Sequence, residues 1–105
     1  MTETDIFKAL ADPTRRAVFE RVAAAAGRSA SELREGLDIS QPAMSQHLAV
    51  LRQAGLISEA RDGRRMNYAV NPEGLAPLRK WLLRYSAFWP ARIEALKDLL
   101  KEMDQ

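Results

Sequence analysis

The sequence predicts a mainly α-helical fold with one small β-hairpin, which places it in the α+β class. Apolar residues recur at helical spacing in segments that are separated by Ser, Asp and Gly. One stretch instead has a β-type composition around Asp62-Gly63, a strong hairpin signal. A long helical stretch then follows the hairpin and contains Pro90.

Length and composition limit the classes of protein. With 105 residues, 47% of them hydrophobic and 29% charged, the chain is expected to form one globular domain over residues 1–105. It contains no cysteine, which excludes disulfides, thiol redox sensing and thiolate metal sites and favours a cytoplasmic location. The acidic N-terminal stretch lacks a continuous apolar run, so we expect neither a signal peptide nor a membrane span.

The first 27 residues predict two helices. The apolar face of a short first helix consists of Ile6, Phe7 and Leu10. Asp12 is a suitable N-cap for the second helix, with Pro13 at its first position, and Gly27 ends it.

Two more helices follow with a tight connection between them. Ser29 and Glu32 have the spacing of a capping box and predict a short third helix. Residues 36–40 form the connection, Ser40 caps a fourth helix, and Gly55 ends that helix. The third and fourth helices thus predict a helix-turn-helix.

The remaining residues complete a winged helix-turn-helix. Residues 56–70 predict the hairpin, and the sequence from residue 73 onward predicts helices interrupted at Pro90. We therefore expect a core over residues 4–72 and C-terminal dimerisation helices over residues 73–105.

Positive charge is concentrated in the middle of the chain. Residues 1–39 carry a net charge of −1, residues 40–85 carry +4, and residues 86–105 carry −1. Localised positive charge is typical of a protein that binds a polyanion, although an uneven solvated surface of this size is an equally good explanation.

The predicted helix over residues 40–54 has two unlike faces. At 100° per residue, one face collects Ala43, Met44, His47, Leu48, Val50, Leu51 and Ala54. The opposite face collects Gln41, Pro42, Ser45, Gln46, Ala49, Arg52 and Gln53. This second face is polar, small and nearly uncharged, so it can enter a DNA major groove, where amides and hydroxyls read base edges. The alternative is that Gln and Ser merely make the helix soluble.

Candidate DNA contacts follow from this face and from the hairpin. The N-terminal part of the second helix reaches the bases in this motif, which favours Gln41, Ser45 and Gln46, with Ser40 and Arg52 nearer the phosphates. Three arginines crowd the hairpin tip and suit phosphate or a narrow minor groove. An ordinary charged hairpin tip would look the same. The predicted DNA-binding residues are Ser40, Gln41, Ser45, Gln46, Arg52, Arg61, Arg64 and Arg65.

Three stretches together resemble the arsenical-resistance-repressor (ArsR/SmtB) family of bacterial winged-helix regulators. They are "ALADPTRRAVFERV", "SELREGLDISQPAMSQHLAVLRQAGLI" and "RDGRRMNYAV", and the resemblance covers residues 4 to 80. It implies a homodimeric transcriptional repressor that binds a palindromic operator, with terminal helices paired across the dimer and DNA released by an effector.

The sequence departs from the metal-sensing members of that family. They carry a Cys-x-Cys in the third helix, where this chain has Ser29 and Ser31, or Asp and His on the last helix, where residues 73–105 contain no histidine. The one histidine, His47, cannot build a zinc site by itself. We therefore expect no metal, no cofactor and a non-metal effector, for which a small molecule is one possibility.

The C-terminal segment carries a large apolar stripe. The predicted dimer-interface residues are Leu78, Trp81, Leu82, Tyr85, Phe88, Trp89, Ile93, Leu96 and Leu100. An intramolecular core is the alternative. Around Pro90, the aromatic residues either seal the dimer, which we favour, or line an apolar pocket for a small effector.

The combined interpretation is a cytoplasmic, sequence-specific DNA-binding regulator without a membrane role. The rival outside this class is a winged-helix module that binds proteins and has no DNA role, and the rival within it is a MarR-type regulator. An enzyme is not expected, because Ser45 and His47 lie two residues apart on one helix and face different directions.

Overall fold

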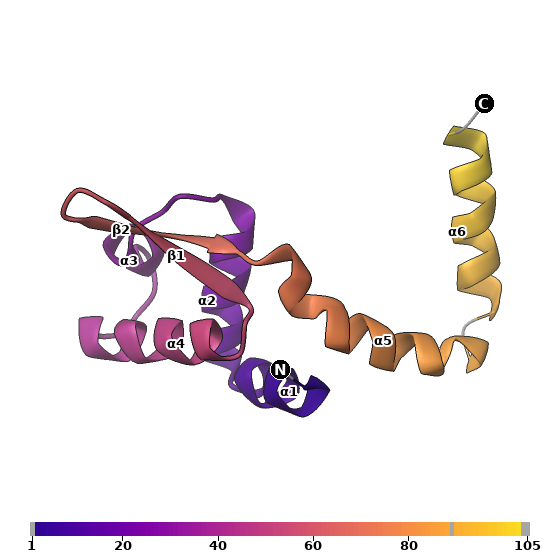
Figure 1. Cartoon of the computed structure of the whole chain (residues 1–105), viewed down its shortest axis with the longest axis horizontal. Helices are drawn as coiled ribbons and strands as arrows, with labels where there is room; N and C mark the ends of the chain where they lie inside the picture. Colours follow the sequence, from indigo (N-terminus) through magenta and orange to yellow (C-terminus); the bar gives the residue numbers. More distant parts are fainter. Residues whose placement is uncertain (1, 89, 104–105) are drawn as a thin grey trace.

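The computed structural model describes residues 2–88 and 90–103, with the side chains of residues 90–94 outside the description. Figure 1 shows the order of the elements along the chain. They are α1 (Glu3–Ala11), α2 (Pro13–Ala24), α3 (Ala30–Arg34), α4 (Gln41–Gln53), β1 (Ile57–Asp62), β2 (Arg65–Val70), η1 (Pro72–Leu75), α5 (Ala76–Arg84), η2 (Ser86–Phe88) and α6 (Pro90–Met103). The predicted class, mainly α with a small hairpin in a winged helix-turn-helix, is confirmed.

The helices begin at the predicted caps. Asp12 Oδ1 accepts hydrogen bonds from the backbone N–H groups of Thr14 at 2.9 Å and of Arg15 at 3.1 Å at the start of α2. Ser29 and Glu32 form the capping box of α3. In each case a polar side chain satisfies N–H groups that the first helical turn leaves unpaired.

Arginines of α2 stabilise the C-terminal ends of other helices. Arg15 donates to the carbonyl of Lys8 at 2.8 Å, and Arg16 donates to the carbonyl of Leu10 at 3.0 Å, so both hold the last turn of α1. Arg21 binds carbonyls at the end of α3, including that of Leu33 at 3.3 Å. These guanidinium groups bind carbonyls that have no partner within their own helix, and they fix α1 and α3 against α2.

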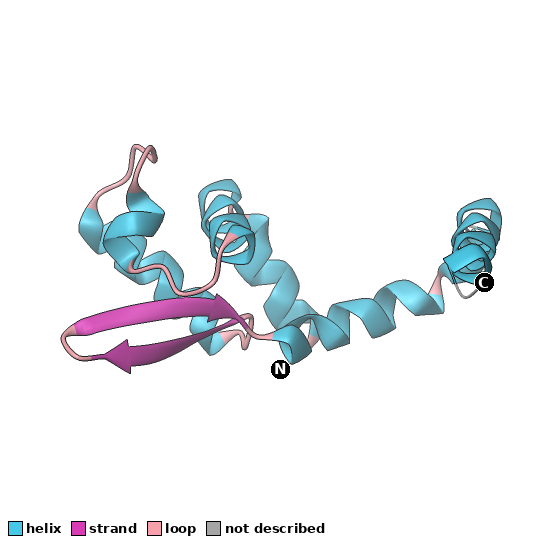
Figure 2. Cartoon of the chain, turned by 90° about the horizontal axis from the view of Figure 1, so that it is seen from above, coloured by secondary structure: helices cyan, strands magenta, loops and turns pink. Residues whose placement is uncertain are grey.

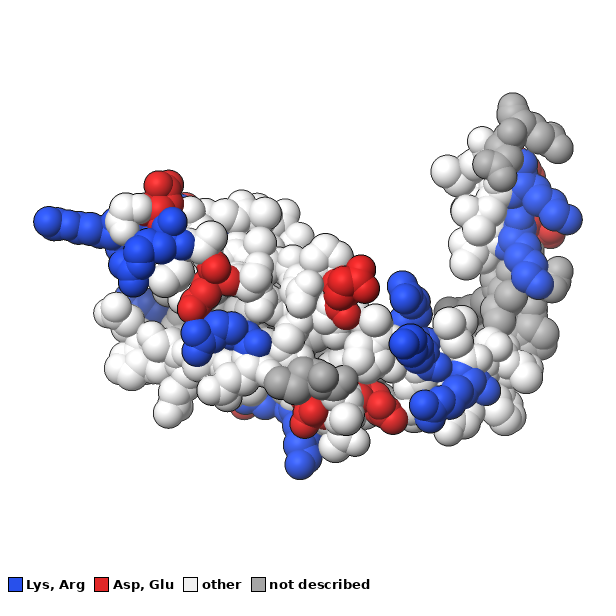
Figure 3. Space-filling model, viewed as in Figure 1, with Lys and Arg blue, Asp and Glu red and all other residues white. Residues whose placement is uncertain are grey.

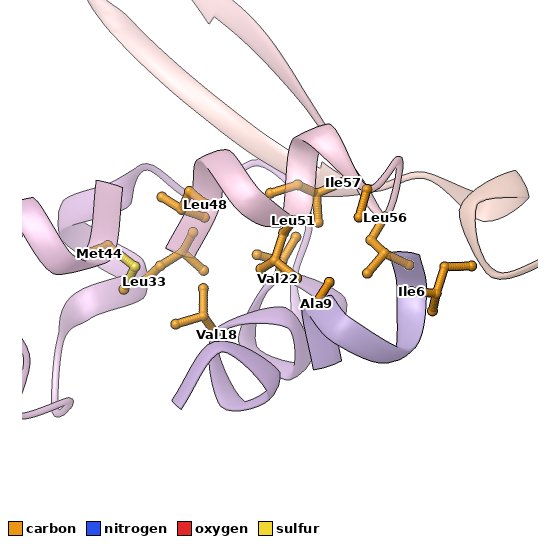
Figure 4. Close-up of a cluster of buried hydrophobic side chains, with 11 residues drawn as sticks. Ile6, Ala9, Val18, Val22, Leu33, Met44, Leu48, Leu51, Leu56 and Ile57 are labelled. Atoms are coloured by element: carbon orange, nitrogen blue, oxygen red, sulfur yellow. The ribbon is translucent and has the colours of Figure 1, made fainter. Parts of the chain in front are cut away.

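The hydrophobic core lies between α4 and the pair α1 and α2 and continues to the root of the hairpin (Figure 4). Its buried residues are Ile6, Ala9, Val18, Val22, Leu33, Met44, Leu48, Leu51, Ala54, Leu56 and Ile57. The predicted inner face of the first helix is only partly correct, because Ala9 is buried whereas Phe7 is 41% exposed.

The hairpin projects from the helices as an antiparallel pair (Figure 2). Its register runs from Ile57 opposite Val70 to Asp62 opposite Arg65, so the two connecting residues are Gly63 and Arg64. Since Gly63 has φ +65° and no described non-glycine residue has a positive φ, the turn has the pattern of type II′. The Asp-Gly signal located the hairpin but placed its turn one residue too early.

The segment before α3 pairs with β2 through an isolated antiparallel β-bridge between Arg28 and Tyr68. Gly27 donates its backbone N–H to the carbonyl of Tyr68 at 3.0 Å, and Tyr68 donates to the carbonyl of Arg28 at 2.9 Å. These two bonds attach β2 to the helix-turn-helix.

The C-terminal helices lead away from the body of the domain (Figure 1). α5 packs on α1, whereas the main contacts of α6 among the described elements are with η2. α6 begins at Pro90, a position at which a helix tolerates proline, so the interruption is a break between two helices and not a bend in one. Among the described residues, no helix is long and apolar enough to cross a membrane.

Candidate nucleic-acid interface

The two faces of α4 lie as the sequence predicts. Met44, Leu48 and Leu51 are at most 2% exposed and pack into the core. On the opposite face Gln41, Pro42, Ser45, Gln46, Arg52 and Gln53 are exposed, and Ala49 is half-buried. α4 is therefore held by its apolar side and presents amides and hydroxyls to solvent.

The N-terminal end of α4 is capped by Ser40. Ser40 Oγ accepts from the backbone N–H of Ala43 at 3.2 Å, while the residue itself stays exposed. Gln41, Ser45 and Gln46 lie within the first two turns of the helix. The structure thus brings together the side chains that the sequence proposes for base contacts.

Charged side chains are distributed unevenly over the surface of the molecule. Lys and Arg gather at the free end of the hairpin and along α5, whereas the surface over α4 is mostly uncharged in this view (Figure 3). A neutral helix beside a cationic hairpin is the arrangement that separates base contacts from phosphate contacts.

Arg52 is paired within the chain. Its Nη1 lies 2.7 Å from Glu59 Oε1 on β1, so the last turn of α4 is joined to the hairpin. Glu59 lies opposite Tyr68 in the register, and burial together with the nearby Glu59 carboxylate raises the pKa of the Tyr68 hydroxyl. Sequence reasoning assigned Arg52 to phosphate and did not identify this partner.

The three hairpin arginines differ from one another. The side chains of Arg61 and Arg64 are exposed and form no hydrogen bond or ion pair among the described residues. Arg65 is instead bound to the Glu32 carboxylate on α3 and, through Nε, to Asn67 Oδ1 at 2.7 Å. Glu32 and Glu59 are the site residues that sequence reasoning missed. The capping spacing identified Glu32 as an N3 residue, but nothing in the sequence connects it to Arg65.

The C-terminal apolar stripe is divided between two surroundings. Leu78 packs against the core, and Trp81 lies against Phe7 and Tyr85, so these residues have contacts within the chain. The exposed apolar side chains of this segment, with Tyr85 among them despite its contact with Trp81, are Leu82 38%, Leu83 61%, Tyr85 41%, Phe88 78%, Leu96 55%, Leu99 53%, Leu100 51% and Met103 73%. Trp89 and the Ile93 side chain lie outside the described residues. A stripe of this size on a single chain is typical of an interface.

No group of three or more His, Asp or Glu side chains within residues 2–88 and 95–103 is arranged to hold a metal ion.

An open cleft of about 250 Å³ lies between α1, α2 and the end of α4. It is lined by Asp5, Lys8, Ala9, Arg15, Val50, Gln53 and Ala54.

A helix-turn-helix with a nearly uncharged outward helix face and a basic hairpin beside it defines a DNA-binding domain of the winged helix-turn-helix class. The helix-turn-helix domain family (HTH_20) matches residues 10–60. The HTH-type transcriptional regulator Rv2034 of Mycobacterium tuberculosis is 42% identical over 94 residues, which cover 90% of this chain and 84% of that protein.

Two further comparisons agree. The transcriptional repressor SdpR of Bacillus subtilis is 35% identical over 81 residues, covering 77% of this chain and 89% of that protein. The solved structure of an ArsR-like transcriptional regulator from Rhodococcus sp. RHA1 superimposes with a TM-score of 0.70 at 31% identity, covering 91% of this chain and 90% of that one. The chain belongs to the ArsR family of transcriptional regulators. It is accordingly a DNA-binding transcriptional regulator and not an enzyme.

Proposed function

We propose that this regulator acts in the cytoplasm as a homodimeric repressor of a palindromic operator. The observation that carries the proposal is the outward face of α4, which is polar, exposed and nearly free of charge. The relative named a transcriptional repressor supports the direction of regulation.

The DNA contacts would be divided by chemistry. Gln41, Ser45 and Gln46 would contact base edges in the major groove, where one good bidentate contact contributes about 1–3 kcal/mol of discrimination. Ser40 and the arginines Arg61 and Arg64 would contact phosphates. Arg52 and Arg65 have carboxylate partners within the chain, and a phosphate would have to compete with those partners.

Dimerisation would bury the exposed apolar residues of α5, η2 and α6. A second copy of the chain is the natural occupant, because a two-fold axis would also place two α4 helices on one side of the DNA. Half-sites about one helical turn apart would then be expected. The aromatic residues near Pro90 would either seal this dimer or line an effector pocket, and Phe88→Ala distinguishes the two roles.

The effector would not be a metal ion. The support is chemical: the chain has no cysteine, a single histidine, and Ser29 and Ser31 where metal-sensing members carry cysteines. Operator affinity should not change with zinc, cadmium, arsenite or a chelator. Loss of binding at stoichiometric metal would contradict this part of the proposal.

Selection from a pool of random duplex DNA with the purified chain tests the proposal as a whole. The expected product is an enriched, roughly two-fold symmetric site, bound with a steep dependence on salt. Recovery of no enriched symmetric sequence would contradict specific binding as a dimer. Phe88→Ala, sedimented beside the wild type, should shift the chain toward monomers if the aromatic residues seal the dimer. A Phe88→Ala protein that remains dimeric and binds DNA fully would contradict the sealing role.

A further inference from the structure

We propose that Arg65 is a positioning residue that holds the hairpin against the helix-turn-helix through Glu32, and that it is not one of the phosphate contacts. The inference rests on the proposed DNA-binding function and divides the hairpin arginines into two groups. Arg61 and Arg64 keep the phosphate role, whereas Arg65 sets where those two arginines lie relative to α4.

Three acceptors surround one guanidinium group. Arg65 Nη2 binds the Glu32 carboxylate and lies 3.4 Å from the carbonyl oxygen of Gly27, and Nε donates to Asn67 Oδ1 at 2.7 Å. These contacts use two of the three guanidinium nitrogens, so only Nη1 is left for another anion. The planar fork of arginine suits such a set of acceptors.

The carboxylate that binds Arg65 is itself fixed. Glu32 Oε1 accepts from the backbone N–H of Ser29 at 3.2 Å and from Ser29 Oγ at 3.0 Å, as part of the α3 capping box. Arg65 therefore ties β2 to the first turn of the first helix of the helix-turn-helix.

The backbone bonds around Tyr68 attach the same part of the hairpin. Gly27 N–H to Tyr68 O and Tyr68 N–H to Arg28 O lie beside the Arg65 contacts, so the side-chain and backbone attachments act on one segment. The neighbouring Arg64, at the turn, has no partner among the described residues and provides a matched comparison.

Substitution of Glu32 gives the sharpest test, because the phosphate role and the positioning role of Arg65 predict opposite changes in operator affinity. If Arg65 bound phosphate, Glu32 would compete with DNA, and Glu32→Gln would strengthen operator binding. If Arg65 positions the hairpin, Glu32→Gln should weaken binding about fivefold relative to its control. Glutamine still completes a capping box, so α3 keeps its N-terminal cap.

Glu35→Gln is the matched control for this charge change. It removes the same charge from an exposed residue directly after α3 and leaves Arg65 untouched. Affinity of Glu32→Gln equal to or tighter than that of Glu35→Gln would overturn the proposal. Thermal unfolding should show both variants folded, because one exposed ion pair contributes little to stability.

Salt dependence gives an independent readout. Arg64→Gln should reduce the slope of log affinity against log salt by about 1, since a phosphate contact is lost. Arg65→Gln should weaken binding while leaving that slope near the wild-type value. Equal reductions in slope for the two variants would overturn the proposal.

Hydrogen exchange in the free protein separates this inference from the proposed function. The amides of Gly27 and Tyr68 should exchange faster in Glu32→Gln than in Glu35→Gln, with or without a DNA partner. Unchanged exchange would overturn the positioning role. Failure of the wild type to bind specific DNA would instead contradict the proposed function. The amide exchange measured in the free protein would still test the positioning role.

Discussion

Phe7 meets Trp81 edge to face, with ring centroids 5.1 Å apart and ring planes at 85°. Trp81 in turn contacts Tyr85, with centroids 4.9 Å apart. The first helix of the chain is thereby fixed to α5, and α5 carries the exposed apolar residues toward α6. The position of the proposed dimer surface relative to α4 therefore depends on this contact.

Trp81→Ala should lower the free energy of unfolding by about 2 kcal/mol. The ring is partly buried and makes two aromatic contacts, so the loss should be smaller than for a fully buried tryptophan. Urea unfolding at fixed protein concentration measures it. Lys80→Ala is the control on the same helix, because Lys80 is exposed and polar and its truncation should change stability by less than about 0.5 kcal/mol. Equal stability of the two variants would show that the Phe7 contact does not fix α5.

Gly74→Ala should be one of the most destabilising single changes in the chain. A Cβ at this position would lie 2.1 Å from the carbonyl oxygen of Gly55, a backbone atom that cannot move aside cheaply. That carbonyl also accepts from Asn71 Nδ2 at 3.0 Å, which joins the end of α4 to the start of η1. The free energy of unfolding, measured with urea, should fall by at least ~2 kcal/mol.

Gly27→Ala is the comparison for that variant. Gly27 has φ +86° but open space around it, so alanine there should cost only about 1 kcal/mol, from backbone strain. If Gly74→Ala were no worse than Gly27→Ala, the close approach of residues 55 and 74 would be contradicted.

Asp12→Asn should change how stability depends on pH. The backbone N–H of Arg15, and then that of Thr14, hold the pKa of the Asp12 carboxyl below its ordinary value. The stabilisation is therefore complete above the unfolded pKa of about 3.9 and is lost as the pH falls through the lower folded pKa. The free energy of unfolding of the wild type should exceed that of Asp12→Asn at pH 6, and the gap should shrink below pH ~4. A constant gap between these pH values would rule out the charged cap.

Leu100→Glu should produce monomers and weaken operator binding. Leu100 is 51% exposed on α6, together with Leu96 and Leu99, and a carboxylate there would be buried in the proposed interface. Sedimentation equilibrium over a range of concentrations measures the change. The control is Lys101→Glu, one residue further along the same helix and away from the apolar residues. Identical association of wild type and Leu100→Glu would show that α6 does not contribute to the dimer.

Local signals in the sequence were sufficient for the helix-turn-helix. The helix caps form hydrogen bonds with backbone N–H groups no more than three residues away, as Asp12, Ser29 and Ser40 do. The two faces of α4 follow from helical periodicity alone. The same periodicity placed Gln41, Ser45 and Gln46 on the exposed face. These features need no knowledge of distant residues.

Long-range contacts could not be predicted in the same way. Glu32 and Arg65 are 33 residues apart, and only the fold brings them together. The sequence predicts Phe7 on the inner face of the first helix, but it does not reveal that Phe7 lies outside the core and contacts Trp81 of α5. Proline at position 90 predicted an interruption, but a proline is compatible both with a bend inside one helix and with the start of a new helix, here Pro90–Met103.

The central claim is that the polar, nearly uncharged face of α4 reads the operator. Selection from random duplex DNA with the Gln46→Ala variant tests this claim most directly. The enriched site should lose its preference at one position, or two adjacent positions, in each half-site, while the other positions and the salt dependence stay as in the wild type. Gln53→Ala, an exposed amide at the far end of the same helix, is the matched control and should return the wild-type site. An unchanged site from Gln46→Ala, with equal discrimination at every position, would contradict the claim.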